Sequence, residues 1–231
     1  MFWKKKIPDA STSEQNAAHQ LYEYLCEAVK KDGRIRVEDL ITAIASVIAE
    51  LCIETAGHFN PRQHQFVPGS RVFSTQVNKI FCGDQNLESA PKGTIVGMLR
   101  DRLLAAGYNL SDFPALETVF SYYAANIGKA SDWGKVPLSI PPDNYPFVLP
   151  LQVAYETRPA VDRIFHALTT PQVKLRASVL TLAEALIAVR QAIDKKIGLT
   201  LALETINGMA KTAPMTDEAM AAAMQNNTRL R

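Results

Sequence analysis

Two long segments of this chain carry almost no charge, and they constrain its fold more than any other feature. The first, residues 37–56, has charges only near its ends, at Glu38, Asp39, Glu50 and Glu54. The second, residues 177–189, has Glu184 as its only charge. In the first segment apolar residues recur every three or four positions, which predicts an α-helix. A helix that is apolar on more than one side is packed by neighbours all round, so we expect both segments at the centre of a helical body.

Helix-start and helix-stop residues divide the rest of the chain into further helices. Ser11 and Glu14 form a capping-box pattern that begins a helix, and Asp32-Gly33 ends it. By the same reasoning we expect helices over residues 71–81, 94–106, 112–127, 151–168, 171–195, 199–210 and 216–225. The predicted fold class is therefore all-α, an irregular multi-helix bundle of about eight helices.

A proline-rich segment separates these helices into two groups. Between residues 133 and 150 five prolines exclude a regular helix, because each removes a hydrogen-bond donor and restrains the residue before it. The segment is nevertheless too apolar to lie free in water, so we expect an extended strap that crosses the helices. A single domain, 1–231, follows from this interpretation. The alternative is a connector, 133–150, between helical subdomains 1–132 and 151–231.

The balance of charges and the spacing of the cysteines limit which partners and which cellular compartment we expect. The 25 basic and 23 acidic side chains nearly cancel, whereas proteins that bind nucleic-acid phosphates usually show a basic excess. We therefore expect no nucleic-acid partner. Three widely spaced cysteines, Cys26, Cys52 and Cys82, fit a reducing cytoplasm. No uncharged run approaches the roughly 20 residues that a membrane-spanning helix requires.

The clearest candidate for a chemical site lies on the first uncharged helix. Thr42, Ser46, Glu50 and Glu54 recur every fourth residue and so share one side of the helix. His58 and His64 follow on the next loop, and together Glu50, Glu54, His58 and His64 could bind a divalent metal, the one cofactor these residues indicate. The alternative is that the stripe is a solvent-facing edge. Glu184, flanked by Thr181 and Ala188, is likewise expected at an exposed edge unless it is paired.

Sequence motifs for catalysis are missing, and this absence shapes the functional prediction. The chain has no Gly-x-Ser-x-Gly motif, no phosphate-binding glycine loop, no His-Glu-x-x-His helix and no CxxC pair. We expect a non-enzymatic protein that acts by protein–protein contact, in a regulatory or adaptor role, or that self-associates, through the strap or through the last helix with its methionines. The alternatives are a metal-dependent enzyme and a peripheral membrane protein held by Met1-Phe2-Trp3 and the three following lysines.

Overall fold

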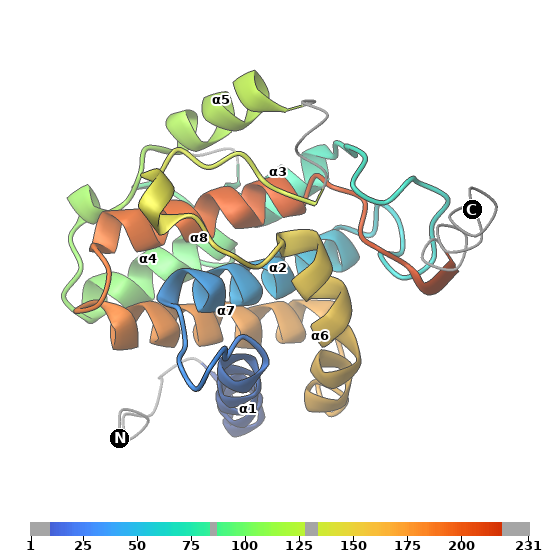
Figure 1. The fold of residues 1–231 in the computed structure, drawn as a ribbon, viewed down its shortest axis with the longest axis horizontal. Coiled ribbons are helices and arrows are strands. Elements are labelled where there is room, and N and C mark those ends of the chain that lie inside the picture. The colour runs from blue at the N-terminus through green and yellow to red at the C-terminus, as the bar shows by residue number, and fades with distance from the viewer. Residues whose placement is uncertain (1–9, 84–86, 128–133, 219–231) are drawn as a thin grey trace.

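The computed structural model describes residues 10–83, 87–127 and 134–218, and within these ranges the protein is all-α with no β-sheet. This confirms the predicted fold class. Eight α-helices follow one another: α1 (Thr12–Ala28), α2 (Val37–Ala56), α3 (Thr75–Cys82), α4 (Ile95–Ala105), α5 (Leu116–Asn126), α6 (Pro150–Ile164), α7 (Pro171–Val189) and α8 (Lys195–Met209). In Figure 1, α2 lies in the middle of the molecule and α5 forms its upper edge.

The helix boundaries near the N-terminus follow from local capping. The Ser11 hydroxyl accepts a hydrogen bond from the Glu14 amide at 3.2 Å, and the Glu14 carboxylate accepts one from the Ser11 amide at 2.8 Å. Helix α2 has the predicted bounds and stops at Gly57, whose φ of +62° is the left-handed conformation that suits a residue without a Cβ. The first of these helices was predicted from such end signals, and the second from its apolar periodicity.

Two predicted helices begin later than expected. Helix α3 starts at Thr75, because Arg71 and Val72 instead pair their backbone with the chain that follows α8. Helix α5 starts at Leu116, since Pro114 separates it from a single 3-10 turn, Leu110–Asp112.

The helices after the strap also differ in their ends. Helix α6 runs unbroken through Pro159, where a break was considered. Helix α7 stops at Val189, short of the predicted 195, and the Asp194 carboxylate then accepts hydrogen bonds from the amides of Lys196 and Ile197. Asp194 therefore begins α8 four residues earlier than predicted.

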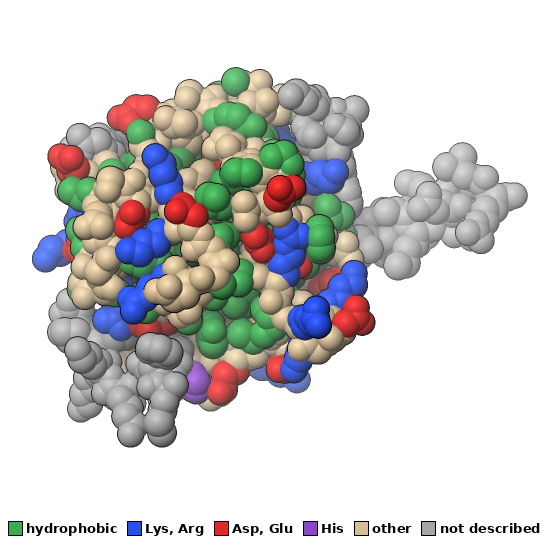
Figure 2. All heavy atoms as spheres, turned by 60° about the vertical axis from the view of Figure 1, so that its left-hand side comes forward, with side chains coloured by type: hydrophobic (Ala, Val, Ile, Leu, Met, Phe, Trp, Pro, Cys, Tyr) green, Lys and Arg blue, Asp and Glu red, His purple; other side chains and the backbone are tan. Residues whose placement is uncertain are grey.

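The surface carries charges of both signs. On the face shown in Figure 2, Lys and Arg side chains are interspersed with Asp and Glu side chains, and no field of a single sign forms. Among the described residues no helix is both long and apolar enough to cross a membrane.

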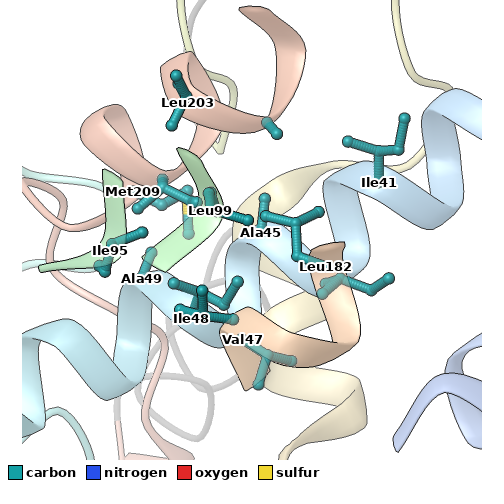
Figure 3. Close-up of a cluster of buried hydrophobic side chains, with 14 of the residues drawn as sticks. Ile41, Ala45, Val47, Ile48, Ala49, Ile95, Leu99, Leu182, Leu203 and Met209 are labelled. Carbon is teal, nitrogen blue, oxygen red and sulfur yellow. The ribbon is translucent and has the colours of Figure 1, made fainter. Parts of the chain in front are cut away.

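The core is built around α2, as expected from its lack of charge. Figure 3 shows its side chains Ile41, Ala45 and Ile48 among Leu182 of α7 and Leu203 of α8. All five are buried within one hydrophobic cluster, which takes residues from helices on both sides of the strap. The strap therefore crosses a core that the two halves of the chain share.

Candidate functional site

The strap is anchored to the N-terminal end of α2 by a buried carboxylate. Asp39, only 7% exposed, accepts hydrogen bonds from the backbone amides of Phe147 at 2.6 Å and Val148 at 3.1 Å. Next to it, the Glu38 carboxylate accepts a hydrogen bond from the side chain of Asn144 at 2.9 Å, and this bond helps to lower the pKa of Glu38 although burial opposes the shift. The two acids thus hold residues 144–148, in the second half of the strap, against the N-terminal end of α2.

A second buried carboxylate, on α8, anchors the first half. Glu204 accepts hydrogen bonds from the Ser139 amide at 2.8 Å and the Ser139 hydroxyl at 2.5 Å. Burial raises the pKa of Glu204, although both hydrogen bonds act in the opposite direction. One turn further along α8, a Cβ on Gly208 would lie 2.3 Å from Cγ1 of Val136, so the close approach of the strap requires glycine there.

The two halves of the strap enclose a pocket against the end of α5. The Leu151 amide donates to the Gly134 carbonyl at 3.3 Å, and the hydroxyls of Tyr122 and Tyr145 both donate to the Leu138 carbonyl, at 3.0 and 2.9 Å. We call this cavity of about 350 Å³ the strap pocket. Its walls are aromatic, aliphatic and proline side chains together with one amide and one charged residue: Tyr122, Asn126, Lys135, Val136, Pro137, Leu138, Tyr145, Pro146, Val148, Leu149 and Pro150.

The residue between the lining residues Pro146 and Val148 has an exposed aromatic side chain. Phe147 is 75% exposed, yet the Arg36 guanidinium lies 3.8 Å from the centroid of its ring. Arg36 also donates to the Asp143 carbonyl at 2.6 Å. The stacked guanidinium therefore holds an exposed aromatic ring in a fixed position.

The predicted metal-binding acids meet arginines instead. Both oxygens of Glu50 accept hydrogen bonds from the Arg158 guanidinium, at 2.6 and 3.0 Å, and Arg158 also donates to the Met215 carbonyl. Glu54, half-buried, lies near Arg62, which pairs with Asp162 of α6. The two glutamates of the predicted stripe thus lie among ion pairs. Glu50 pairs with Arg158, and Glu54 lies near the Arg62–Asp162 pair.

The other members of the stripe and the two histidines are dispersed. Thr42 and Ser46 are fully buried, which contradicts a continuous solvent-facing edge. His58 is exposed, and Nε2 of His64 lies 3.0 Å from the Pro214 carbonyl oxygen. In the part of the chain that the structure describes, no three His, Cys, Asp or Glu side chains are placed to hold a metal ion. Metal binding stays a prediction, which metal analysis of the purified protein and of Glu54→Ala and His58→Ala variants would test.

Glu184 is paired, not exposed. Its carboxylate accepts hydrogen bonds from the Arg102 guanidinium of α4, one of them at 3.0 Å, and only 13% of its side chain is accessible. The expectation of an exposed edge at Thr181 was also wrong, because that side chain is buried and donates to the Ala18 carbonyl. Glu184 joins α4 to α7.

A buried lysine lies beneath α5. Lys211 is 5% exposed, donates to the side-chain oxygen of Asn207, and places its ammonium 4.6 Å from the Phe120 ring and 5.4 Å from the Tyr123 ring. No carboxylate pairs with it in the described ranges. Burial lowers the pKa of Lys211 to about 8.

Two segments with functional predictions lie wholly or largely outside the described residues. These are the aromatic and basic N-terminus, residues 1–6, and most of the predicted last helix, 216–225, with Met220 and Met224. The remaining methionine of that group, Met215, is buried.

Comparison of the chain with protein-family models, curated proteins and solved structures finds no match. Function therefore has to be argued from the chemistry of the sites described above.

Proposed function

We propose that this protein acts by binding another protein and that the strap pocket is its docking surface. The observation that carries the proposal is a pocket of about 350 Å³ walled by tyrosines, prolines and aliphatic side chains, with one asparagine and one lysine. Concave apolar sites that hold an anchoring side chain of the partner contribute most of the binding energy at many protein interfaces. Because Asp39 and Glu204 hold the strap at both halves, the pocket exists before a partner arrives.

The exposed aromatic residues of the strap favour a protein partner over a small molecule. The pocket volume is at the low end of the range for small-molecule sites, roughly 300–1,000 Å³. Tyr145, which lines the pocket, exposes 40% of its surface, and Phe147, two residues later in the strap, exposes 75% with Arg36 stacked on its ring. Aromatic residues and arginine are enriched in protein interfaces.

We also infer that the protein works in a reducing compartment such as the cytoplasm. Its three cysteines, Cys26, Cys52 and Cys82, are all free thiols. Burial raises the pKa of Cys52 to about 12 and also raises that of Cys26, so neither thiol is activated for disulfide exchange.

Site-specific photocross-linking in cells tests the docking surface. A benzophenone amino acid placed at Tyr145 should yield a discrete cross-linked partner, whereas the same group at Leu110, which is 42% exposed outside the strap, should not. Filling the pocket with Asn126→Trp should abolish the product from position 145 while circular dichroism stays unchanged. Identical products from positions 145 and 110, or a product from 145 that survives Asn126→Trp, would exclude the pocket as the docking surface.

A further inference from the structure

The first half of the strap has the burial pattern of a β-strand, although no strand pairs with it in the described ranges. From residue 134 to 140 every second residue is buried, at Gly134, Val136, Leu138 and Ile140. Lys135 and Ser139 between them are exposed, and Pro137 is half-buried. This period of two is the alternation of an extended backbone laid on a hydrophobic surface.

One edge of this extended segment faces the strap pocket. In extended backbone the N–H and C=O of one residue point to the same side, and the next residue points to the other. The Leu138 carbonyl meets the pocket tyrosines, Tyr122 and Tyr145, whereas the Ser139 amide points away, to Glu204. The N–H groups of Leu138 and of Val136, two residues earlier, therefore lie on the pocket side.

Those two backbone donors, the Val136 and Leu138 amides, lack an acceptor within the described part of the chain. A peptide in extended conformation that lies alongside such an edge gains backbone hydrogen bonds for its affinity and uses side-chain pockets for its specificity. A helix offers no free backbone acceptors along its side for this purpose.

The charge of the pocket selects among extended peptides. Lys135 is the one charged residue among the lining residues, and no carboxylate pairs with it in the described part of the chain. An acidic side chain of a ligand would therefore meet an unpaired ammonium beside an apolar wall, whereas a basic side chain would be repelled.

We infer that the strap pocket binds an extended acidic segment of its protein partner. The segment lies along residues 135–138, places one bulky apolar side chain between the two halves of the strap, and directs an Asp or Glu to the Lys135 ammonium. This inference rests on the proposed function, because it names the class of partner for the same surface.

Panning a phage-displayed library of random dodecapeptides on the full chain tests the inference. Phage that also bind the Asn126→Trp variant are removed first, so that the remaining binders depend on the pocket. We expect these peptides to share an acidic residue next to a bulky apolar one, and to lose about tenfold in affinity when that acid is replaced by its amide, as measured by fluorescence anisotropy.

Charge reversal provides the matched control. Lys135→Glu should weaken the acidic peptide about tenfold or more, and the peptide's acid-to-amide change should then have no further cost. Lys196→Glu, at an exposed lysine of α8, should leave the affinity within twofold.

Replacing the peptide amide whose carbonyl meets the Val136 N–H by an ester should weaken binding several-fold, because an ester carbonyl is the poorer acceptor.

Four outcomes would overturn the inference. Pocket-dependent peptides that lack an acid, or that bind Lys135→Glu equally well, would contradict the charge assignment and leave the docking surface intact. Helical binders would contradict the extended geometry. If no peptide is enriched while position 145 still cross-links to a partner, the inference fails and the proposed function stands. If the cross-link is absent too, both fail.

Discussion

The two halves of helix α2 hold acidic side chains in different ways. In its first turn Asp39 is buried and accepts two backbone N–H groups of the strap, and no Lys, Arg or His of the described ranges forms an ion pair with it. In its C-terminal half Glu50 is almost as well covered, but both of its oxygens accept hydrogen bonds from the Arg158 guanidinium. On the same helix, backbone N–H groups stabilise the Asp39 carboxylate and an arginine stabilises the Glu50 carboxylate.

The position of each acid along α2 accounts for this difference. Asp39 lies in the first turn, where the partial positive charge of the helix N-terminus stabilises a carboxylate. Glu50 lies six residues before the last helical residue, Ala56, where the dipole of neither helix end acts on it. Neutral N–H donors suffice where the dipole assists, and a guanidinium is needed where it does not. We expect a buried charge to reduce the stability of this fold wherever it has neither a counter-charge nor a favourable helix dipole with N–H donors.

Arg158→Ala should have the largest effect on this comparison, because it leaves the Glu50 carboxylate largely buried without its counter-charge. We expect a loss of about 4 kcal/mol in the free energy of unfolding, measured by urea denaturation. The double variant Glu50→Gln/Arg158→Met, which removes both charges, should recover more than half of that loss. Equal stability of the two variants would show that the guanidinium acts by packing and hydrogen bonding to Met215, not by balancing charge.

Lys211, two residues after the end of α8, extends the comparison to a buried cation at a helix C-terminus that no carboxylate pairs with among the described residues. Its pKa of about 8 in the folded protein lies below the 10.5 of an unfolded lysine. The folded state therefore binds fewer protons between these values, so stability is reduced below pH 8 and rises as the pH increases from 8 to 10.5. Between pH 7 and pH 10 we expect a gain of about 2 kcal/mol.

The control for this pH dependence is Lys211→Met, which keeps a long unbranched side chain and removes its charge. The variant should lose the rise between pH 8 and pH 10 and should be at least as stable as the natural chain at pH 7. A rise that persists in Lys211→Met would assign the effect to other groups.

Asp39→Ala tests how much the hydrogen bonds from the strap amides to Asp39 stabilise the fold. Two strap amides lose their acceptor, and we expect a loss of about 2 kcal/mol together with faster proteolysis within residues 134–149. Asp39→Asn retains a side-chain oxygen for the same amides and should restore most of the stability. If Asp39→Asn were as destabilised as Asp39→Ala, the negative charge itself would be the stabilising element.

Glu54→Gln should have the smallest effect. Glu54 follows Glu50 by one turn but is half-buried, with Arg62 already paired to Asp162. We expect a change within about 0.5 kcal/mol, by the same urea titration. A loss near that of Arg158→Ala would show that Glu54 belongs to the buried ion-pair network.

Local signals in the sequence were enough for the helices but not for their partners. The bounds of α2 follow from apolar periodicity and from Gly57, and the strap follows from its prolines. The start of α3 could not be predicted, because Arg71 and Val72 are held by backbone contacts with residues about 140 positions later. Only tertiary contacts distinguish such a segment from the first turn of a helix.

The candidate site was predicted in part, and its missed residues had a recognisable signal. Glu204 lies in an apolar run, Leu199 to Ile206, in the same way as Glu184 does in its own run. An isolated acid in such a run indicates a buried anchor, and both acids are indeed bonded to distant elements. Which element they contact, Ser139 of the strap or Arg102 of α4, depends on the packing of the helices and leaves no trace in local spacing.

The enclosure of α2 has a consequence for synthesis on the ribosome. Its apolar sides are covered by α7 and α8, and about 150 residues separate the end of α2 from the end of α8. At translation rates of about 5–20 residues per second, α2 would wait roughly 10–30 s for its covering helices. During that interval the apolar surface of α2 is exposed to other molecules of the cell. We therefore expect that a chaperone bound to the nascent α2 would increase the yield of native protein.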